Sequence, residues 1–191
     1  MSTTAMVGQF TFSDVQRLID ELASSVSRDF SPRQPLNIVG IRTRGEVLAA
    51  RLAARLHTSG FVDIRRGVLD ISLYRDDLTE IGPRPSIKPT IIDVPIDGVP
   101  MLLVDDVLFT GRSVRAALTL LGDFGRPSFV RLAVLVDRGG RELPIHADYV
   151  PLDLRQTPRD HRINVRFTEI DGVDEITIAP KHSPLASGGN P

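Results

Sequence analysis

Apolar residues recur along the chain with two patterns, which separate the predicted helices from the predicted strands. Residues 13–28 carry apolar side chains at the i, i+3, i+4 and i+7 positions of a helix, namely Val15, Leu18, Ile19, Leu22 and Val26. Residues 45–57 and 112–124 have the same helical spacing. The pattern therefore predicts three amphipathic helices, with Ser13 as the N-cap of the first.

Short continuous apolar runs predict buried strands at 36–41, 101–104 and 129–136, and a further strand is predicted at 67–74. Two β segments follow, near 163–170 and 174–179. Strands that are apolar throughout and alternate with helices are typical of a parallel sheet covered on both faces. The fold class is therefore α/β. We find no repeat or linker, so residues 1–179 form one domain, and the Pro/Gly/Ser-rich stretch 180–191 is predicted to be a disordered tail.

Composition excludes several classes of protein. A net charge of −1 gives no general affinity for nucleic acid, although a local basic face remains compatible with it. The chain has no cysteine, which excludes disulfides, thiolate metal sites and cysteine nucleophiles. The first residues lack the basic and apolar regions of a signal peptide, and no apolar run approaches the ~20 residues of a membrane helix. We expect a cytoplasmic protein that does not enter a membrane.

The stretch "MLLVDDVLFTGRSV" (101–114) carries the clearest candidate chemistry. A buried strand leads to Asp105 and Asp106, and a turn of small and hydroxyl residues then precedes a helix. Unpaired N–H groups at a helix N-terminus favour an anion, and Gly111 permits close approach of the backbone. The two acids would repel that anion, so they suit ribose hydroxyls or Mg²⁺. The loop predicts a sugar-phosphate site, whereas the alternative is a solvated acidic pair before an ordinary helix.

Two other polar stretches lie where a parallel sheet binds ligands, beyond the carboxyl ends of its strands. "IRTRG" (41–45) follows a strand and opens a helix, although on its own it would be an exposed basic turn. Residues 74–95 form a long charged segment interrupted by four prolines. A loop of this length is usually either a functional lid or a mobile surface segment.

Four stretches resemble the PyrR family, bifunctional pyrimidine operon regulators and uracil phosphoribosyltransferases. One is the loop at 101–114, which resembles the phosphoribosyl diphosphate (PRPP) signature of type I phosphoribosyltransferases. The others are "VGIRTRGEVLAARL" (39–52), "LDISLYRDDLTEIG" (69–82) and "LAVLVDRGGRELPIHADYV" (132–150). The resemblance spans roughly residues 11–179. It implies the type I phosphoribosyltransferase fold, with a flexible hairpin lid and a small β hood.

The resemblance implies a reaction in which uracil and PRPP give UMP and diphosphate, with Mg²⁺ accompanying PRPP. It assigns catalysis to Asp105, Asp106 and Arg44, and the two acids would contact Mg²⁺ indirectly through PRPP. It assigns PRPP binding to Thr43, Arg44, Asp105, Asp106, Val107, Leu108, Phe109, Thr110, Gly111, Arg112 and Ser113. It also gives the lid residues Arg75 and Asp76, and the uracil-site residues Asp137, Arg138 and Ile163. For Asp137 and Arg138 the alternative is an ion pair at the end of a strand.

The family also binds a stem-loop of pyrimidine-operon leader mRNA, more tightly with UMP, on a dimer or higher homo-oligomer. Arg141, His146, Arg155 and Arg159 are the candidate RNA-binding residues. This chain departs from the family pattern at Asp20, Glu21 and Gly140 and after Val150, where an expected lysine is missing. Acidic side chains facing RNA phosphates would be unfavourable. Two alternatives follow, an enzyme that has lost RNA binding and a type I phosphoribosyltransferase for another base.

Overall fold

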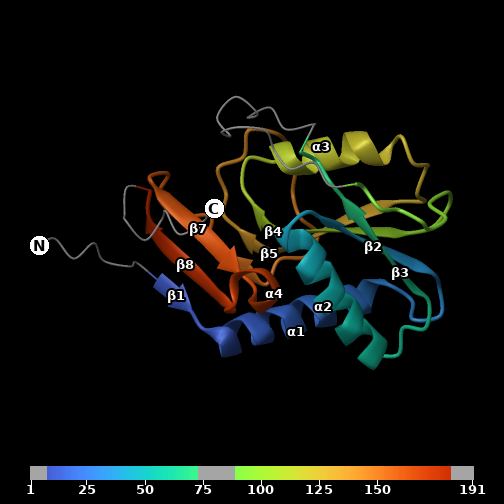
Figure 1. Ribbon diagram of the computed structural model, residues 1–191, viewed down its shortest axis with the longest axis horizontal. Helices are drawn as coiled ribbons and strands as arrows, with labels where there is room; N and C mark the ends of the chain where they lie inside the picture. The colour runs from blue at the N-terminus through green and yellow to red at the C-terminus, as the bar shows by residue number, and fades with distance from the viewer. Residues whose placement is uncertain (1–7, 73–88, 182–191) are drawn as a thin grey trace, which may run out of the picture.

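The computed structural model describes residues 8–72 and 89–181, and its helices and strands alternate through most of the chain (Figure 1). The predicted lid residues Arg75 and Asp76 and most of the predicted tail lie outside this range. In chain order the elements are β1 (Gly8–Phe10), α1 (Phe12–Asp29), β2 (Leu36–Ile41), α2 (Arg44–Thr58), β3 (Ile64–Leu69), β4 (Met101–Leu108), α3 (Arg112–Leu121), β5 (Val130–Asp137), β6 (Leu152–Asp153), β7 (His161–Arg166), α4 (Thr168–Asp171) and β8 (Glu175–Pro180).

A five-stranded sheet in the order β3-β2-β4-β5-β6 forms the centre of the fold. Each neighbouring pair of its strands is parallel. Figure 1 shows α1 and α2 on one side of this sheet and α3 on the other. The predicted fold class, an α/β fold with a mostly parallel sheet and helices on both faces, is confirmed.

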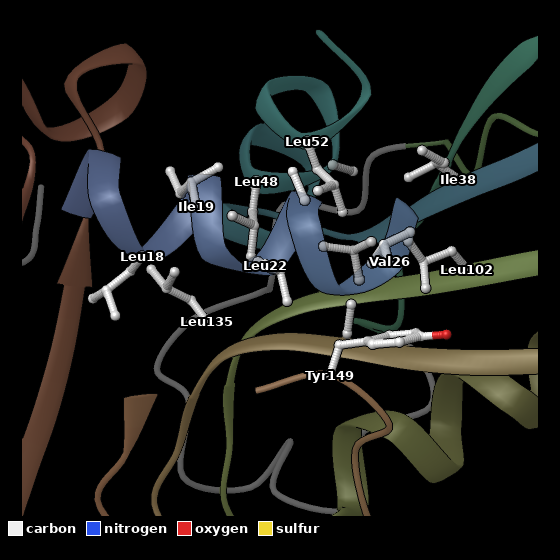
Figure 2. Close-up of a cluster of buried hydrophobic side chains, with 14 of the residues drawn as sticks. Leu18, Ile19, Leu22, Val26, Ile38, Leu48, Leu52, Leu102, Leu135 and Tyr149 are labelled. Atoms are coloured by element: carbon white, nitrogen blue, oxygen red, sulfur yellow. The ribbon is translucent and has the colours of Figure 1, made fainter. Parts of the chain in front are cut away.

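Alternate residues of the central strands supply the two halves of the core. Ile38, Leu102 and Leu135 pack with apolar residues of α1 and α2, and Figure 2 shows part of this cluster around Leu22 and Leu52. The intervening strand residues, such as Leu103 and Val134, pack with α3 on the other face. This two-sided burial is the physical reason why the central strands have continuous apolar sequences.

A smaller antiparallel sheet, in the order β1-β8-β7, forms the hood. Its strand β1 was not predicted, because three residues carry little periodicity and pair only with β8. The segment predicted as β at 163–170 is also divided, since β7 ends at Arg166 and the short helix α4 follows. Gly172, in the left-handed region with φ +72°, ends α4 before β8.

Two other expected boundaries are wrong. β3 begins at Ile64 and ends at Leu69, rather than running from 67 to 74. It is an edge strand of the central sheet, so its polar residues need no cover, and the apolar pattern located it poorly. The N-cap of α1 is Thr11 rather than Ser13, because the Asp14 carboxylate accepts a hydrogen bond from the Thr11 N–H at 2.9 Å.

Candidate active site

The predicted diphosphate loop and the predicted PRPP loop start from paired strands and pack directly on each other. β2 pairs with β4, with Gly40 opposite Val104. A Cβ at Gly40 would lie 2.5 Å from the carbonyl oxygen of Gly45. A Cβ at Gly45 would lie 2.6 Å from the carbonyl oxygen of Val104 and 3.1 Å from Cα of Asp105. Glycine at these positions therefore lets the start of α2 lie against the end of β4.

Asp105 and Asp106 lie within β4, which continues to Leu108 instead of ending at residue 104. Backbone pairing with β5 extends the strand through its polar positions, as Asp105 lies opposite Val134 and Leu108 opposite Asp137. The Asp105 carboxylate is buried and accepts a hydrogen bond from the Asp106 N–H at 3.0 Å. Burial raises the pKa of the Asp106 carboxyl, and the hydrogen bond with Asp105 and the nearby positive charge of Arg44 oppose that rise.

The turn after β4 leads into the N-terminus of α3, a few residues after the two acids. Gly111 is the N-cap of α3 with φ +91° and has no side chain to cap the helix, while the Thr110 hydroxyl accepts a hydrogen bond from the Arg112 N–H at 3.3 Å. The Thr110 carbonyl accepts hydrogen bonds from the N–H groups of Glu142 and Leu143, at 3.0 and 3.2 Å. Arg112 Nε donates to the Glu142 carboxylate at 2.7 Å. The segment after β5 therefore fixes the predicted PRPP turn.

The predicted uracil site brings Arg138 and the start of β7 together. Arg138 is 7% exposed, and its guanidinium lies 3.9 Å from the centroid of the Phe109 ring. It donates to the carbonyl oxygen of His161, two residues before buried Ile163. Within the described ranges its Nε is buried without a hydrogen-bond partner, and burial lowers the pKa of Arg138.

Asp137 is held away from Arg138. Its carboxylate accepts hydrogen bonds from the Gly139 N–H at 2.8 Å and from Arg141 Nη2 at 2.6 Å. The alternative of a pair between Asp137 and Arg138 therefore describes the wrong arginine. Gly140, one of the departures from the family pattern, leaves room for Phe109, because a Cβ there would lie 2.6 Å from the ring.

Arg141, predicted to bind RNA, is turned into the fold. Besides its pair with Asp137, it donates to the carbonyl oxygens of Ile145 and Phe109 at 2.8 Å each, and its side chain is 17% exposed. The other three candidate RNA-binding residues, His146, Arg155 and Arg159, are exposed, and Arg155 pairs with Asp153.

The acids of the first helix have arginine partners. Asp20 pairs with Arg55 at 2.5 Å and Glu21 with Arg17 at 2.7 Å. Their repulsion of RNA is therefore partly compensated within the protein.

The end of β3, just before the predicted lid segment, pairs with residues around Ile91 further along the chain. Val68 and Ile91 exchange backbone hydrogen bonds of 2.8 and 2.9 Å. Arg42 Nη2 donates to the Pro89 carbonyl oxygen at 3.4 Å, which connects this return to the diphosphate loop. The peptide bond between Arg42 and Thr43 is cis.

A group of acids on α4 and at the start of β8 was missed, because the sequence there was interpreted as strand. Glu169, Asp171 and Asp174 pair with arginines of α2, where Arg44 and Arg51 lie two turns apart on one helix face. That spacing, opposite a run of acids in "TEIDGVDE", is the available sequence signal. The described residues include no group of three or more possible metal-ligating side chains. None of the described helices is long and apolar enough to cross a membrane.

The fold and the two packed loops define a phosphoribosyltransferase, and the family model "Phosphoribosyl transferase domain" matches residues 11–169. Hypoxanthine phosphoribosyl transferase from Trypanosoma cruzi shares the fold, with a TM-score of 0.71 and 20% identity over 97% of this chain and 95% of that one.

Comparison with curated relatives shows which phosphoribosyltransferase family the chain belongs to. Bifunctional protein PyrR of Roseiflexus sp. is 49% identical over 86% of this chain and 90% of its own. That of Mycobacterium ulcerans is 46% identical over 94% of this chain and 93% of its own. The chain belongs to the PyrR family.

Proposed function

We propose that this protein is a uracil phosphoribosyltransferase that forms UMP and diphosphate from uracil and PRPP. The observation that carries the proposal is the contact of Gly45 with the end of β4. It brings the start of α2, with Thr43 and Arg44, next to Asp105 and Asp106, and the N-terminus of α3 follows within the same loop. One site thus offers donors for two phosphate groups and carboxylates for the sugar between them.

In the proposed reaction, N1 of uracil forms a bond to C1 of the ribose while the bond from C1 to the diphosphate oxygen breaks. N1 releases its proton to solvent, and diphosphate carries away the bonding electrons. Positive charge develops on the ribose ring, and negative charge on the leaving group. Arg44 and the loop N–H groups stabilise the leaving diphosphate. Asp106 accepts hydrogen bonds from the ribose hydroxyls and orients the ring.

Two carboxylates fit the way in which proteins usually hold Mg²⁺ beside a phosphate ligand, with the other positions filled by phosphate oxygens and water. Asp105 and Asp106 would hold the ion, directly or through water, and it would neutralise diphosphate charge. We assign no general base. His57 lies near the far end of α2, and His161 pairs with Asp160.

The uracil end of the site is proposed to use Arg138 and the backbone around Ile163. Arg138 is positioned by Phe109 and by the His161 carbonyl oxygen, and its buried Nε still lacks a partner among the described residues. A buried unpaired donor is unfavourable, so a ligand carbonyl that accepts from it would be favoured. Uracil offers two such carbonyl oxygens.

The test is UMP formation from uracil, PRPP and Mg²⁺, followed by chromatography. Hypoxanthine, guanine and orotate serve as competing bases under the same conditions. We expect UMP as the main product. Faster turnover of a purine or of orotate would instead establish a phosphoribosyltransferase for another base, and no product from any base would refute the enzyme proposal.

The second proposed function is UMP-dependent binding of pyrimidine-operon leader mRNA, favoured by the PyrR relatives. Arg155, Arg159 and His146 are exposed, although Arg155 would have to exchange its partner Asp153 for a phosphate, whereas Arg141 would act mainly by shaping the loop. The test is filter binding of the leader RNA at two salt concentrations, with and without UMP. Selective binding that UMP strengthens supports this function. Weak binding with the same affinity in the presence and absence of UMP means that the chain acts as the enzyme alone.

A further inference from the structure

Arg44, the proposed diphosphate-binding arginine, is held by a carboxylate of α4, the short helix between two strands of the hood. Its Nη2 lies 2.7 Å from Oδ1 of Asp171 and its Nε lies 3.3 Å from Oδ2. This two-point contact fixes the plane of the guanidinium. Asp171 belongs to α4, more than 120 residues away in the sequence. Arg44 Nη1 has no hydrogen-bond partner within residues 8–72 and 89–181, and the Arg44 side chain remains 37% exposed.

Asp171 is itself fixed in place. Its Oδ2 accepts a hydrogen bond from the Phe167 N–H at 2.9 Å, and its side chain is only 15% exposed. A second contact with α2 lies two helical turns beyond Arg44. There Arg51 pairs with Glu169 of α4 at 2.5 Å and with Asp174 at 2.6 Å. The hood therefore presents Asp171 to Arg44 from a fixed position.

We propose that Asp171 is a positioning residue that orients Arg44 toward the diphosphate group of PRPP. The idea rests on the proposed function, because it assigns Arg44 to diphosphate. A free arginine side chain has many rotamers, and a ligand that orders it must overcome that loss of freedom. With Nε and Nη2 held by Asp171, Nη1, which has no partner among the described residues, is oriented before the ligand arrives. The alternative is that Asp171 only attaches the hood to α2.

The matched pair of variants is Asp171→Asn and Glu169→Gln. Both remove one carboxylate of α4 that pairs with an arginine of α2, but only Asp171 contacts Arg44. Asparagine keeps a carbonyl oxygen for the Phe167 N–H. We expect D171N to raise the KM for PRPP and the inhibition constant of inorganic diphosphate about 5- to 20-fold, corresponding to about 1–2 kcal/mol. The KM for uracil should not change, and E169Q should resemble the unmodified protein in all three constants.

The double variant R44A/D171N tests whether Asp171 acts through Arg44. If it does, D171N adds nothing to the effect of R44A. Additive losses, or a D171N variant that behaves like E169Q, would overturn the proposal. Should D171N lower the melting temperature, Asp171→Glu decides, because it restores the charge on a longer side chain. Diphosphate affinity must then recover in part, and no recovery counts against positioning.

Calorimetric titration of PRPP with Mg²⁺, without uracil, separates this inference from the proposed enzyme activity. If the unmodified protein binds PRPP but forms no UMP, the enzyme proposal fails while the comparison of D171N with E169Q remains valid. Equal affinities of D171N and E169Q for PRPP would reject the positioning role even in an active enzyme.

Discussion

Asp106 illustrates, at the scale of one residue, how a binding site can lower the stability of the protein that contains it. Burial raises the pKa of its carboxyl, although Asp105 and Arg44 oppose the shift. A carboxyl with a raised pKa in the folded state stabilises the fold only while it is protonated. That contribution is complete below the unfolded pKa and is lost as the pH rises through the folded pKa. Above its raised folded-state pKa, the ionised Asp106 therefore disfavours the folded state.

Replacing Asp106 by asparagine should separate stability from activity. We expect D106N to raise the melting temperature at pH 7, because a buried charge is removed, and to lower kcat/KM about 10- to 100-fold, because hydrogen bonds to a charged group are lost. Thermal unfolding and initial rates measure the two effects. Asp93→Asn, at an exposed position, is the control and should change neither. A lower melting temperature for D106N would contradict the proposed cost of burial.

At the scale of elements, the close contact between α2 and β4 requires a residue without a side chain, Gly45. A Cβ at Gly45 would lie 2.6 Å from the Val104 carbonyl oxygen, a contact with backbone that cannot move away easily. We expect Gly45→Ala to destabilise the fold by about 1–3 kcal/mol and to raise the KM for PRPP, because the two loops are forced apart. Gly8→Ala is the control, since its nearest neighbour, Ile178 Cδ1, would be at 3.4 Å. Equal melting temperatures for the two variants would refute this explanation.

The ion pair between Asp174 and Arg51 of α2 should stabilise the fold less as the pH falls. Burial raises the pKa of Asp174, but hydrogen bonds from Arg51 and Thr168 outweigh it and lower the pKa to about 2. A lowered pKa gives stability that is present above the unfolded value of 3.8 and is lost as the pH falls toward 2. For this buried side chain the contribution is about 2 kcal/mol. Urea unfolding between pH 6 and 2 should show the loss.

The matched controls for this acid dependence are two asparagine variants. Asp174→Asn should lower stability near neutral pH and flatten the profile below pH 5. Asp153 also has a pKa of about 2 through Arg155, but it is exposed, so Asp153→Asn should change the profile little. A profile for D174N as steep as that of the unmodified protein would show that other carboxylates dominate acid unfolding.

How far the sequence predicted these elements depended on burial. β2 begins and ends at the predicted residues, and α1 differs from its prediction by one residue at each end, because their apolar faces are fully packed. β3 is at the edge of the sheet, β1 is defined only by pairing with β8, and α4 has one turn. None of these has enough buried side chains to produce a readable period. The two loops around Arg44 and Asp106 were predicted as sites, whereas Asp171 of α4, which contacts Arg44, was not.

At the scale of the whole molecule, the enzyme and the RNA-binding proposals draw on different arginines. Arg44 and Arg138 face the proposed substrate site, and Arg141 is turned inward. The family resemblance places α1 on the RNA side, and there Arg55 is neutralised by Asp20. The layer formed by α1 and α2 therefore carries a positive charge on Arg55, but Asp20 neutralises it.

Removing Asp20 should release that charge. We expect Asp20→Asn to strengthen leader-RNA binding about 2- to 5-fold at low salt and to steepen its salt dependence, because Arg55 becomes available to phosphate. Filter binding at two salt concentrations measures the change. Asp63→Asn is the matched control, since Asp63 neutralises Arg65 in a partly exposed pair at the start of β3. Equal effects of the two variants would mean that only net charge matters.

One stretch of the hood contacts both ends of the proposed site. The carbonyl oxygen of His161 receives Arg138, next to the base, and the carboxylate of Asp171 receives Arg44, next to the leaving group. Ten residues of chain therefore help to set the distance between the two substrates. A change in the length of that stretch would alter the recognition of base and diphosphate together. Insertions between β7 and α4 should therefore be rare among active relatives, even though Phe167, which joins the two elements, has no assigned role in the chemistry.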